Sequence, residues 1–240
     1  MRIWGITDRG SVREQNQDSF DGRIINDNSV VAVVCDGMGG AKAGNIASGI
    51  AVERFISGFL GEDKSMDIPQ RMLNAAAAAN HEVFLRSTTE TECRGMGTTL
   101  VAAHATENQA TILNEGDSRA YYINESGIIR VTRDHSLVQH LLERGDITEE
   151  QARSHPQKNL ITRALGAEAE LKADQYDLPW KQGEFLLLCS DGLSNTVTEQ
   201  EMLYEVIHGG DPSSCCQRLL DISIQRGAPD NVTAVLIMNG

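Results

Sequence analysis

The sequence predicts an α+β fold in which two antiparallel β-sheets pack together and helices cover them from outside. Three observations lead to this prediction. Residues 30–35 and 185–190 form very apolar runs, which is typical of strands buried on both faces. Further strand-like segments follow one another with only short turns between them, as in an antiparallel meander. Two long segments with helical periodicity stand next to each other in the chain.

The N-terminal half supplies a strand, a hairpin and the two helices. We expect strands at residues 3–7, 19–25 and 29–35, the last two joined around Asn26-Asp27-Asn28. The first helix, over residues 43–60, has Val52, Phe55, Ile56 and Phe59 on one face. The second, over residues 68–86, has an apolar stripe that includes Met72, Ala76, Ala79 and Val83. A core-facing stripe explains both patterns without any functional role.

The remainder of the chain alternates between strands and short helices. Strands are expected at 98–106, 109–115, 119–124 and 128–132, then at 171–177, 185–190 and 231–238. Residues 136–165 are more polar, and Ser136…Gln139 and Thr148…Gln151 match the capping-box pattern at a helix start. We therefore expect two short helices in a small lobe attached to the sheets. Thr198…Glu201 opens another helix, and a last one is expected over 212–225.

Composition and charge restrict the partners. The 240 residues are 40% hydrophobic and 23% charged, which is ordinary for a globular protein, and the formal net charge is −13. An acidic surface argues against binding to nucleic acid or to an anionic membrane. A phosphorylated substrate stays compatible with this charge if the site holds divalent cations.

The cysteines and the N-terminus indicate the compartment. The five cysteines have no metal-ligand spacing, and we expect all of them to be reduced. The first residues have no signal-peptide layout, and no segment approaches the roughly 20 apolar residues needed to cross a bilayer. These features predict a cytoplasmic protein.

Four aspartates share one sequence context, a short loop at a strand end beside Gly or Asn. A carboxylate at the end of a buried strand is unfavourable unless a cation or hydrogen-bond donors compensate it. Oxygen-only ligands suit hard divalent ions such as Mg²⁺ or Mn²⁺. Any one Asp-Gly pair is most simply an ordinary turn, but four such sites together predict a metal centre. The four are Asp36, Asp117, Asp191 and Asp230.

Two ions sharing a carboxylate and a bridging water would provide a nucleophile for attack on phosphorus. Such a site needs no side-chain nucleophile, and no Ser/His/Asp or Cys/His arrangement stands out in the chain. Arg13, in the polar segment Ser11-Val-Arg-Glu-Gln-Asn-Gln-Asp18, has a planar guanidinium that can bind two phosphoryl oxygens. Alone, an arginine in a loop would indicate nothing.

Seven short motifs follow one another over almost the whole chain: Thr7-Asp-Arg-Gly-Ser-Val-Arg, Asp36-Gly-Met-Gly-Gly, Gly95-Met-Gly-Thr-Thr, Gly116-Asp-Ser-Arg, Asp134-His-Ser, Ser190-Asp-Gly-Leu and Asp230-Asn-Val-Thr. In this order they resemble the motifs of the metal-dependent serine/threonine phosphatases of the PPM, or protein phosphatase 2C, family. Residues 136–165 are similar to its bacterial branch, which opposes Ser/Thr kinases of eukaryotic type.

The resemblance implies a fold and a ligand set. The fold would be an αββα sandwich of two antiparallel sheets flanked by helix pairs, a single domain over residues 1–240 with a flap at about 136–165. Asp36 would bridge two Mn²⁺ or Mg²⁺ ions, and the Gly37 carbonyl would bind one of them. Asp191 and Asp230 would hold the other, and Asp117 with Asp191 would offer a third, weaker site. Arg13 would bind the substrate phosphate.

Two positions depart from the animal members of that family. Gln17-Asp18 stands where they have Glu-Asp, so one ion should bind more weakly or Asp18 should act through water. Met38 stands where they have a histidine that can act as general acid, so the leaving group must be protonated by other means. Bacterial members share this difference, which therefore does not indicate loss of activity.

The sequence thus predicts a phosphatase that hydrolyses phosphoserine and phosphothreonine in proteins by attack of a metal-bridging hydroxide. Arg13, Asp36 and Asp191 are its expected catalytic residues. Its partners would be phosphorylated proteins and a cognate Ser/Thr kinase, and the default state would be a monomer. Two alternatives stay open: a pseudophosphatase that binds without turnover, against which the four intact aspartates argue, and a partner-switch module acting on one regulatory protein.

Overall fold

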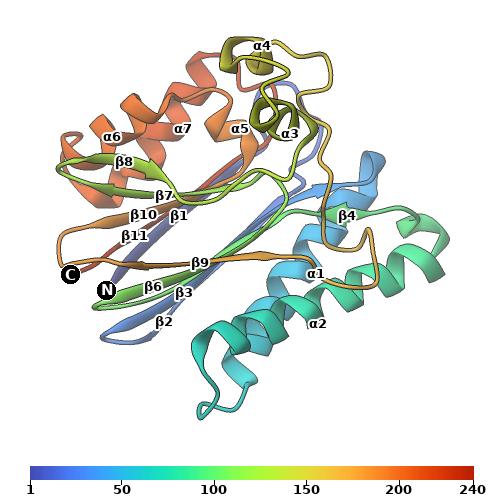
Figure 1. The fold of residues 1–240 in the computed structure, drawn as a ribbon, viewed down its shortest axis with the longest axis horizontal. Helices are drawn as coiled ribbons and strands as arrows, with labels where there is room; N and C mark the ends of the chain where they lie inside the picture. The colour runs from blue at the N-terminus through green and yellow to red at the C-terminus, as the bar shows by residue number, and fades with distance from the viewer.

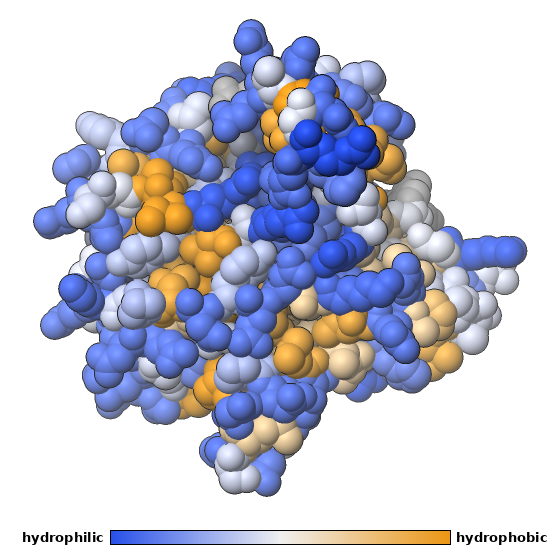
Figure 2. Space-filling model, in the orientation of Figure 1, coloured by the Kyte–Doolittle hydropathy of each residue, from blue (hydrophilic) through white to orange (hydrophobic). Residues whose placement is uncertain are grey.

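The structure, a computed structural model, describes residues 1–240, except for the side chains of residues 40–42 and 153. None of the helices in this described part is long and apolar enough to cross a membrane. Hydrophilic side chains dominate the face seen in Figure 2, with hydrophobic residues in separate patches between them.

Two antiparallel sheets lie face to face between two groups of helices (Figure 1), which confirms the predicted α+β sandwich. One sheet has the strand order β1-β11-β10-β7-β8. The other has the order β2-β3-β5-β6-β9, and β4 pairs with β3 beside it. The strands are β1 (Arg2–Asp8), β2 (Asp18–Asn26), β3 (Ser29–Met38), β4 (Gly97–Thr98), β5 (Leu100–Thr106), β6 (Gln109–Glu115), β7 (Arg119–Asn124), β8 (Gly127–Arg130), β9 (Asp174–Pro179), β10 (Phe185–Cys189) and β11 (Val232–Met238).

The helices occupy both outer layers. The α-helices are α1 (Gly40–Gly61), α2 (Ile68–Thr89), α3 (Leu137–Glu143), α4 (Glu149–Arg153), α5 (Asp191–Ser194), α6 (Glu199–Ile207) and α7 (Cys215–Gln225), with 3₁₀ turns at Thr91–Cys93 and Pro212–Ser214. In Figure 1, α1 and α2 cover one sheet, α6 and α7 cover the other, and α3 and α4 lie at one end of the sandwich.

The two central strands are buried on both faces, as their apolar runs predict. Along β3, Val31 and Val33 belong to the core under α1 and α2, while Val30 and Val34 belong to the core between the sheets. Along β10, Leu187 packs under the C-terminal helices and its neighbours pack between the sheets. A residue period of two places successive side chains on opposite faces, so a continuous apolar run fills two cores at once.

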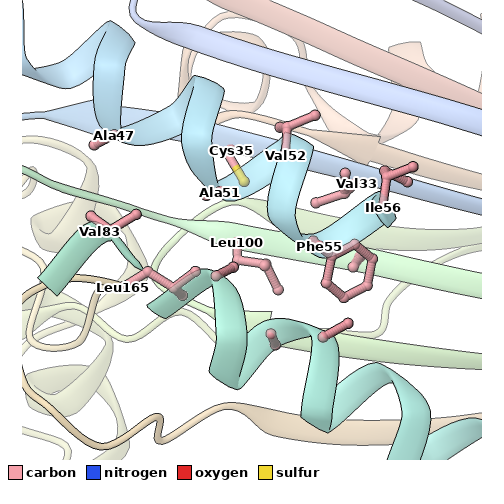
Figure 3. Close-up of a cluster of buried hydrophobic side chains, with 14 of the residues drawn as sticks. Val33, Cys35, Ala47, Ala51, Val52, Phe55, Ile56, Val83, Leu100 and Leu165 are labelled. Carbon is pink, nitrogen blue, oxygen red and sulfur yellow. The ribbon is translucent and has the colours of Figure 1, made fainter. Parts of the chain in front are cut away.

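The apolar stripe of α1 faces the sheet and α2, as the periodicity predicts. Phe55 and Phe59 are fully buried and stack with ring centroids 6.4 Å apart. Figure 3 shows Val52, Phe55 and Ile56 on α1 beside Val33 of β3. Small residues of α2, Ala75, Ala76 and Ala79 among them, are buried against this layer and permit close helix packing.

The polar segment after β8 contains the two expected short helices. The Ser136 hydroxyl accepts a hydrogen bond from Gln139 N at the start of α3. At the start of α4, Thr148 and Gln151 form both hydrogen bonds of a capping box. A bridge between Ser136 and Ile161 joins the start of the segment to its later part, and a bridge between Leu165 and Thr98 of β4 joins its end to the sandwich.

Some predicted boundaries are wrong for reasons outside the local sequence. A strand is expected at 171–177, but β9 spans Asp174–Pro179. It begins later because the backbone of Lys172 forms hydrogen bonds with side chains instead of with a neighbouring strand. Its N–H donates to Glu115 Oε2 at 3.1 Å, and its carbonyl accepts from Arg163 at 3.3 Å. The helix expected from 212 begins as a 3₁₀ turn capped by Asp211, and α7 begins at Cys215.

Candidate active site

Loops at one end of the two sheets enclose a pocket of about 460 Å³. The chain reaches it from the β1–β2 loop, the end of β3, the β6–β7 turn, the start of α5 and the α7–β11 turn. The structure thus brings together seven of the eight residues singled out from the sequence, and places Asp18 beside them as the register partner of Asp36. The seven that line the pocket are Arg13, Gln17, Asp36, Gly37, Asp117, Asp191 and Asp230.

Asp36 is held by its backbone at the point where β3 leaves its pairing with β5. Its N–H donates to Thr99 Oγ1 at 2.9 Å, and its carbonyl accepts from the Thr99 N–H and the Thr98 hydroxyl, each at 2.9 Å. These contacts use only main-chain groups of Asp36. The carboxylate is left available to the pocket, where Asp117, Asp191 and further acidic groups face it.

Gly37 stands where no other residue fits. A Cβ at this position would lie 2.0 Å from the Gly44 carbonyl oxygen and 2.7 Å from the Gln17 carbonyl oxygen. The Gly37 N–H donates to that same Gln17 carbonyl at 3.1 Å, so the β3 end and the β2 entrance are tied together. The close approach explains the glycine after Asp36 and keeps the backbone of Gly37 at the pocket wall.

Asp18 lies under the pocket floor, in the space between the sheet ends. Its Oδ2 accepts hydrogen bonds from the hydroxyls of Ser190 and Thr233, both at 2.7 Å. Its Oδ1 is buried without a partner among the described residues. Burial raises the pKa of Asp18 to about 6, although the two hydroxyl donors oppose this shift.

The pocket concentrates uncompensated negative charge. Burial, reinforced by neighbouring carboxylates, raises the pKa of Asp36 well above its usual range. Burial and then Asp191 raise the pKa of Asp117 to about 8, and burial and then Asp230 raise that of Asp191 to about 6. These pKa values are raised because nearby protein groups supply too little positive charge to stabilise the ionised carboxylates. That is the pattern expected of side chains that bind a cation.

Arg13 is the arginine in the described lining that offsets part of this charge, while Arg119, outside the lining, opposes the rise in the pKa of Asp117 and Asp191. Arg13 Nη2 contacts Asp230 Oδ2 at 2.7 Å, and this hydrogen bond raises the pKa of Arg13. The Arg13 side chain is 49% exposed and that of Asp230 is 26% exposed. The expected phosphate-binding arginine and an expected metal ligand therefore pair with each other here.

The donor chemistry fits hard divalent ions. Asp191 Oδ1 is buried without a hydrogen-bond partner among the described residues, while its Oδ2 accepts from Asn195 at 3.1 Å. No three Asp, Glu, His or Cys side chains in the described part of the chain are grouped to hold one ion unaided. A pair of ions that share carboxylates, a backbone carbonyl and water does not need such a trio.

Sequence reasoning missed the residue that anchors the arginine loop. Asn231 is buried, its amide donates to the carbonyls of Arg9 at 2.8 Å and Gln15 at 2.9 Å, and its Oδ1 accepts from Gln17 N at 2.8 Å. These bonds hold both ends of the segment that carries Arg13. Its position directly after Asp230 was the available signal that Asn231 lies at the site. Its hydrogen-bond partners could not be predicted, because they lie more than 200 residues away in the chain.

The polar lobe and a buried histidine also contribute. Asn159 and Ile161, after α4, line the pocket. His135 Nδ1 accepts from Gly116 N at 3.1 Å, and the backbone N–H of His135 donates to the Gly116 carbonyl at 2.8 Å. Gly116 has φ +115°, and a Cβ there would lie 2.6 Å from a Thr99 methyl. The turn that bears Asp117 is thus fixed from both sides.

Residues 9–219 match the family model described as protein phosphatase 2C. The chain is 38% identical over 235 residues to the serine/threonine phosphatase stp of Listeria monocytogenes, with 96% of this chain and 93% of that protein covered. The similarity therefore spans nearly the full length of both proteins.

Solved structures show the same arrangement of the chain. The serine/threonine phosphatase Stp1 from Staphylococcus aureus matches with a TM-score of 0.92 at 33% identity, over 98% of this chain and 94% of that one. The catalytic domain of the serine threonine protein phosphatase PstP, in complex with two manganese ions, matches with a TM-score of 0.86 at 31% identity, over 98% and 96%.

Proposed function

The chain belongs to the protein phosphatase 2C family and is a protein phosphatase, a hydrolase; from that premise we propose that it removes phosphate from phosphoserine and phosphothreonine with two Mn²⁺ or Mg²⁺ ions. The observation that carries the proposal is the convergence of Asp36, Asp117, Asp191 and Asp230 on one pocket, with a buried Asp191 oxygen that has no partner among the described residues.

We assign the ligands as follows. Asp36 would contact both ions, the Gly37 carbonyl would contact one, and Asp191 and Asp230 would hold the other. Asp117, with Asp191, would form a weaker third site. When bound, the ions supply an activated water nucleophile and screen the charge of the phosphoryl oxygens. Gln17 and Asp18 would act from outside the ligand set, Asp18 by accepting hydrogen bonds from the Ser190 and Thr233 hydroxyls.

Arg13 would exchange one anion for another during the reaction. Its guanidinium, now on Asp230, would bind two phosphoryl oxygens of the substrate. The bonds of Asn231 keep the loop in place while the arginine changes its partner. Met38 lines the pocket but has no proton to donate, so the leaving seryl or threonyl oxygen must take its proton from water or another group.

Residues 136–165 would serve as a flap on a single domain of 240 residues. Asn159 and Ile161 support this role because both line the pocket. The enzyme would act as a cytoplasmic monomer and would reverse a bacterial Ser/Thr kinase of eukaryotic type. Phosphoproteomics of a strain that lacks the gene tests the last claim, which requires phosphoserine or phosphothreonine sites to accumulate.

The direct test is hydrolysis of a small aryl phosphate and of a phosphothreonine peptide, each with Mn²⁺ and with a chelator. We expect turnover only with the metal, and near-complete loss of turnover in Asp36→Asn. Metal-independent turnover, or an Asp36→Asn variant with full activity, would refute the assignment. Asp27→Asn, in an exposed turn at the other end of β3, is the matched control.

A further inference from the structure

A second pocket shares a wall with the first. It measures about 620 Å³ and lies between the C-terminal turn of α2, strand β4 and the backbone of residues 164–167. Met38 lines both pockets, and its Cγ lies 3.7 Å from the position that a Cβ on Gly97 would take. The half-buried Met38 side chain is therefore the partition between the two cavities.

This groove, defined by the residues in the second pocket, has an apolar floor. Phe84 is half-buried on α2, Met96 is 1% exposed and Ala164 is 6% exposed. The hydroxyls of Thr88 and Thr89 are already used, since each donates to a carbonyl one turn back in its own helix. The floor made by Phe84, Met96 and Ala164 therefore offers contact to aliphatic or aromatic groups.

The rim of the groove has one cation without a partner. Arg94 is exposed and makes no ion pair or side-chain hydrogen bond to any residue that the structure describes. The acidic residue of the same rim, Glu90, is occupied, because Arg86 binds both of its carboxylate oxygens at 2.9 and 3.0 Å. In a chain with a net charge of −13, the rim thus offers a positive charge to an incoming group.

We propose that this groove binds the polypeptide segment next to the phosphorylated residue of the substrate, with an apolar side chain on the Phe84 floor and an acidic one at Arg94. The proposal rests on the proposed function, since it assumes that the phosphate enters the first pocket. An extended chain advances about 3.3 Å per residue, so a neighbour within a few positions of the phosphoresidue crosses Met38 into the groove.

The geometry separates two kinds of substrate. A small aryl phosphate has no flanking chain and reports on the first pocket alone. A phosphopeptide reaches both pockets. The ratio of kcat/KM for a peptide to kcat/KM for the aryl phosphate therefore isolates the contribution of the groove, whatever a substitution does to the chemistry.

The experiment measures this ratio for phosphothreonine peptides that carry Asp, Ala or Lys at each of the three positions on either side, with and without a neighbouring Leu. In Arg94→Glu we expect the ratio for the best acidic peptide to fall at least tenfold and the Lys peptides to gain. In Phe84→Ser we expect the advantage of Leu to disappear. Lys64→Glu and Leu85→Ser are the controls, since Lys64 and the 44% exposed Leu85 lie outside the groove.

Melting temperatures of all variants identify any that fail to fold, and Phe84→Leu replaces Phe84→Ser if that one does. Ratios that match those of the controls in both groove variants would overturn the proposal while leaving the phosphatase assignment intact. Loss of wild-type aryl phosphate hydrolysis would instead refute the proposed function itself.

Discussion

Replacing Asn231 by Ala should loosen the arginine loop and weaken substrate binding without removing any expected metal ligand. The substitution deletes three hydrogen bonds of 2.8–2.9 Å to backbone groups of the β1–β2 loop. At about 1 kcal/mol net for each, the free energy of unfolding should fall by about 3 kcal/mol. For a chain of this size that corresponds to a decrease of about 6–12 °C in Tm. It is an upper bound, because water can reach part of the released loop.

The kinetic effect follows from the same contacts. Without its anchors the loop no longer holds Arg13 over the pocket, so KM for an aryl phosphate should rise about tenfold, which is about 1.4 kcal/mol. The assay combines thermal unfolding with steady-state kinetics at saturating Mn²⁺.

The chain offers a matched control at the other end of the same strand. Asn239 is also buried, follows β11 directly and donates one side-chain hydrogen bond, to the Glu107 carbonyl at 2.8 Å. Asn239→Ala should lower Tm by about 2–4 °C and leave KM unchanged. If Asn231→Ala changed neither Tm nor KM beyond its Asn239 counterpart, the anchoring role would be wrong.

Three further predictions concern Arg13, Gly37 and His104. Arg13→Ala should raise KM, and should also lower kcat if the guanidinium contact strengthens in the transition state; unchanged steady-state constants would exclude a role in phosphate binding. Gly37→Ala should lose most activity and stability, because its Cβ would lie 2.0 Å from the Gly44 carbonyl oxygen; a fully active variant would contradict the observed packing. Burial lowers the pKa of His104 to about 4, so between pH 6.5 and 4 this histidine is protonated in the unfolded chain but neutral in the folded one. Acidification over this range should therefore lower the free energy of unfolding of the wild type by up to about 3 kcal/mol relative to His104→Gln. Urea titrations of both proteins at pH 7.5 and 4.5 measure that difference, and parallel pH profiles would refute it.

Most of the fold could be predicted from the sequence because the patterns that indicate strands and helix starts are local. Apolar runs identified β3 and β10, and the capping pattern at Thr198 placed the start of α6 at Glu199. Where an element boundary depends on residues far away in the chain, the predicted boundary was wrong. The start of β9 is an example, because contacts of Lys172 with Glu115 and Arg163 decide it.

The pocket residues also divide into those with a local sequence signal and those without one. Asp36 and Asp191 could be singled out because a carboxylate at the end of an apolar strand is unusual in any sequence. The pairing of Arg13 with Asp230 could not, since 217 residues separate them. Asn159 gave no local signal either, because only the path of the lobe brings it to the pocket wall.

The most direct measurement is anomalous diffraction at the manganese edge from crystals soaked in Mn²⁺. We expect two strong peaks that share the Asp36 carboxylate, one also near the Gly37 carbonyl and the other between Asp191 and Asp230, with Arg13 released from Asp230. A pocket without manganese peaks, or with ions bound away from these aspartates, would contradict it.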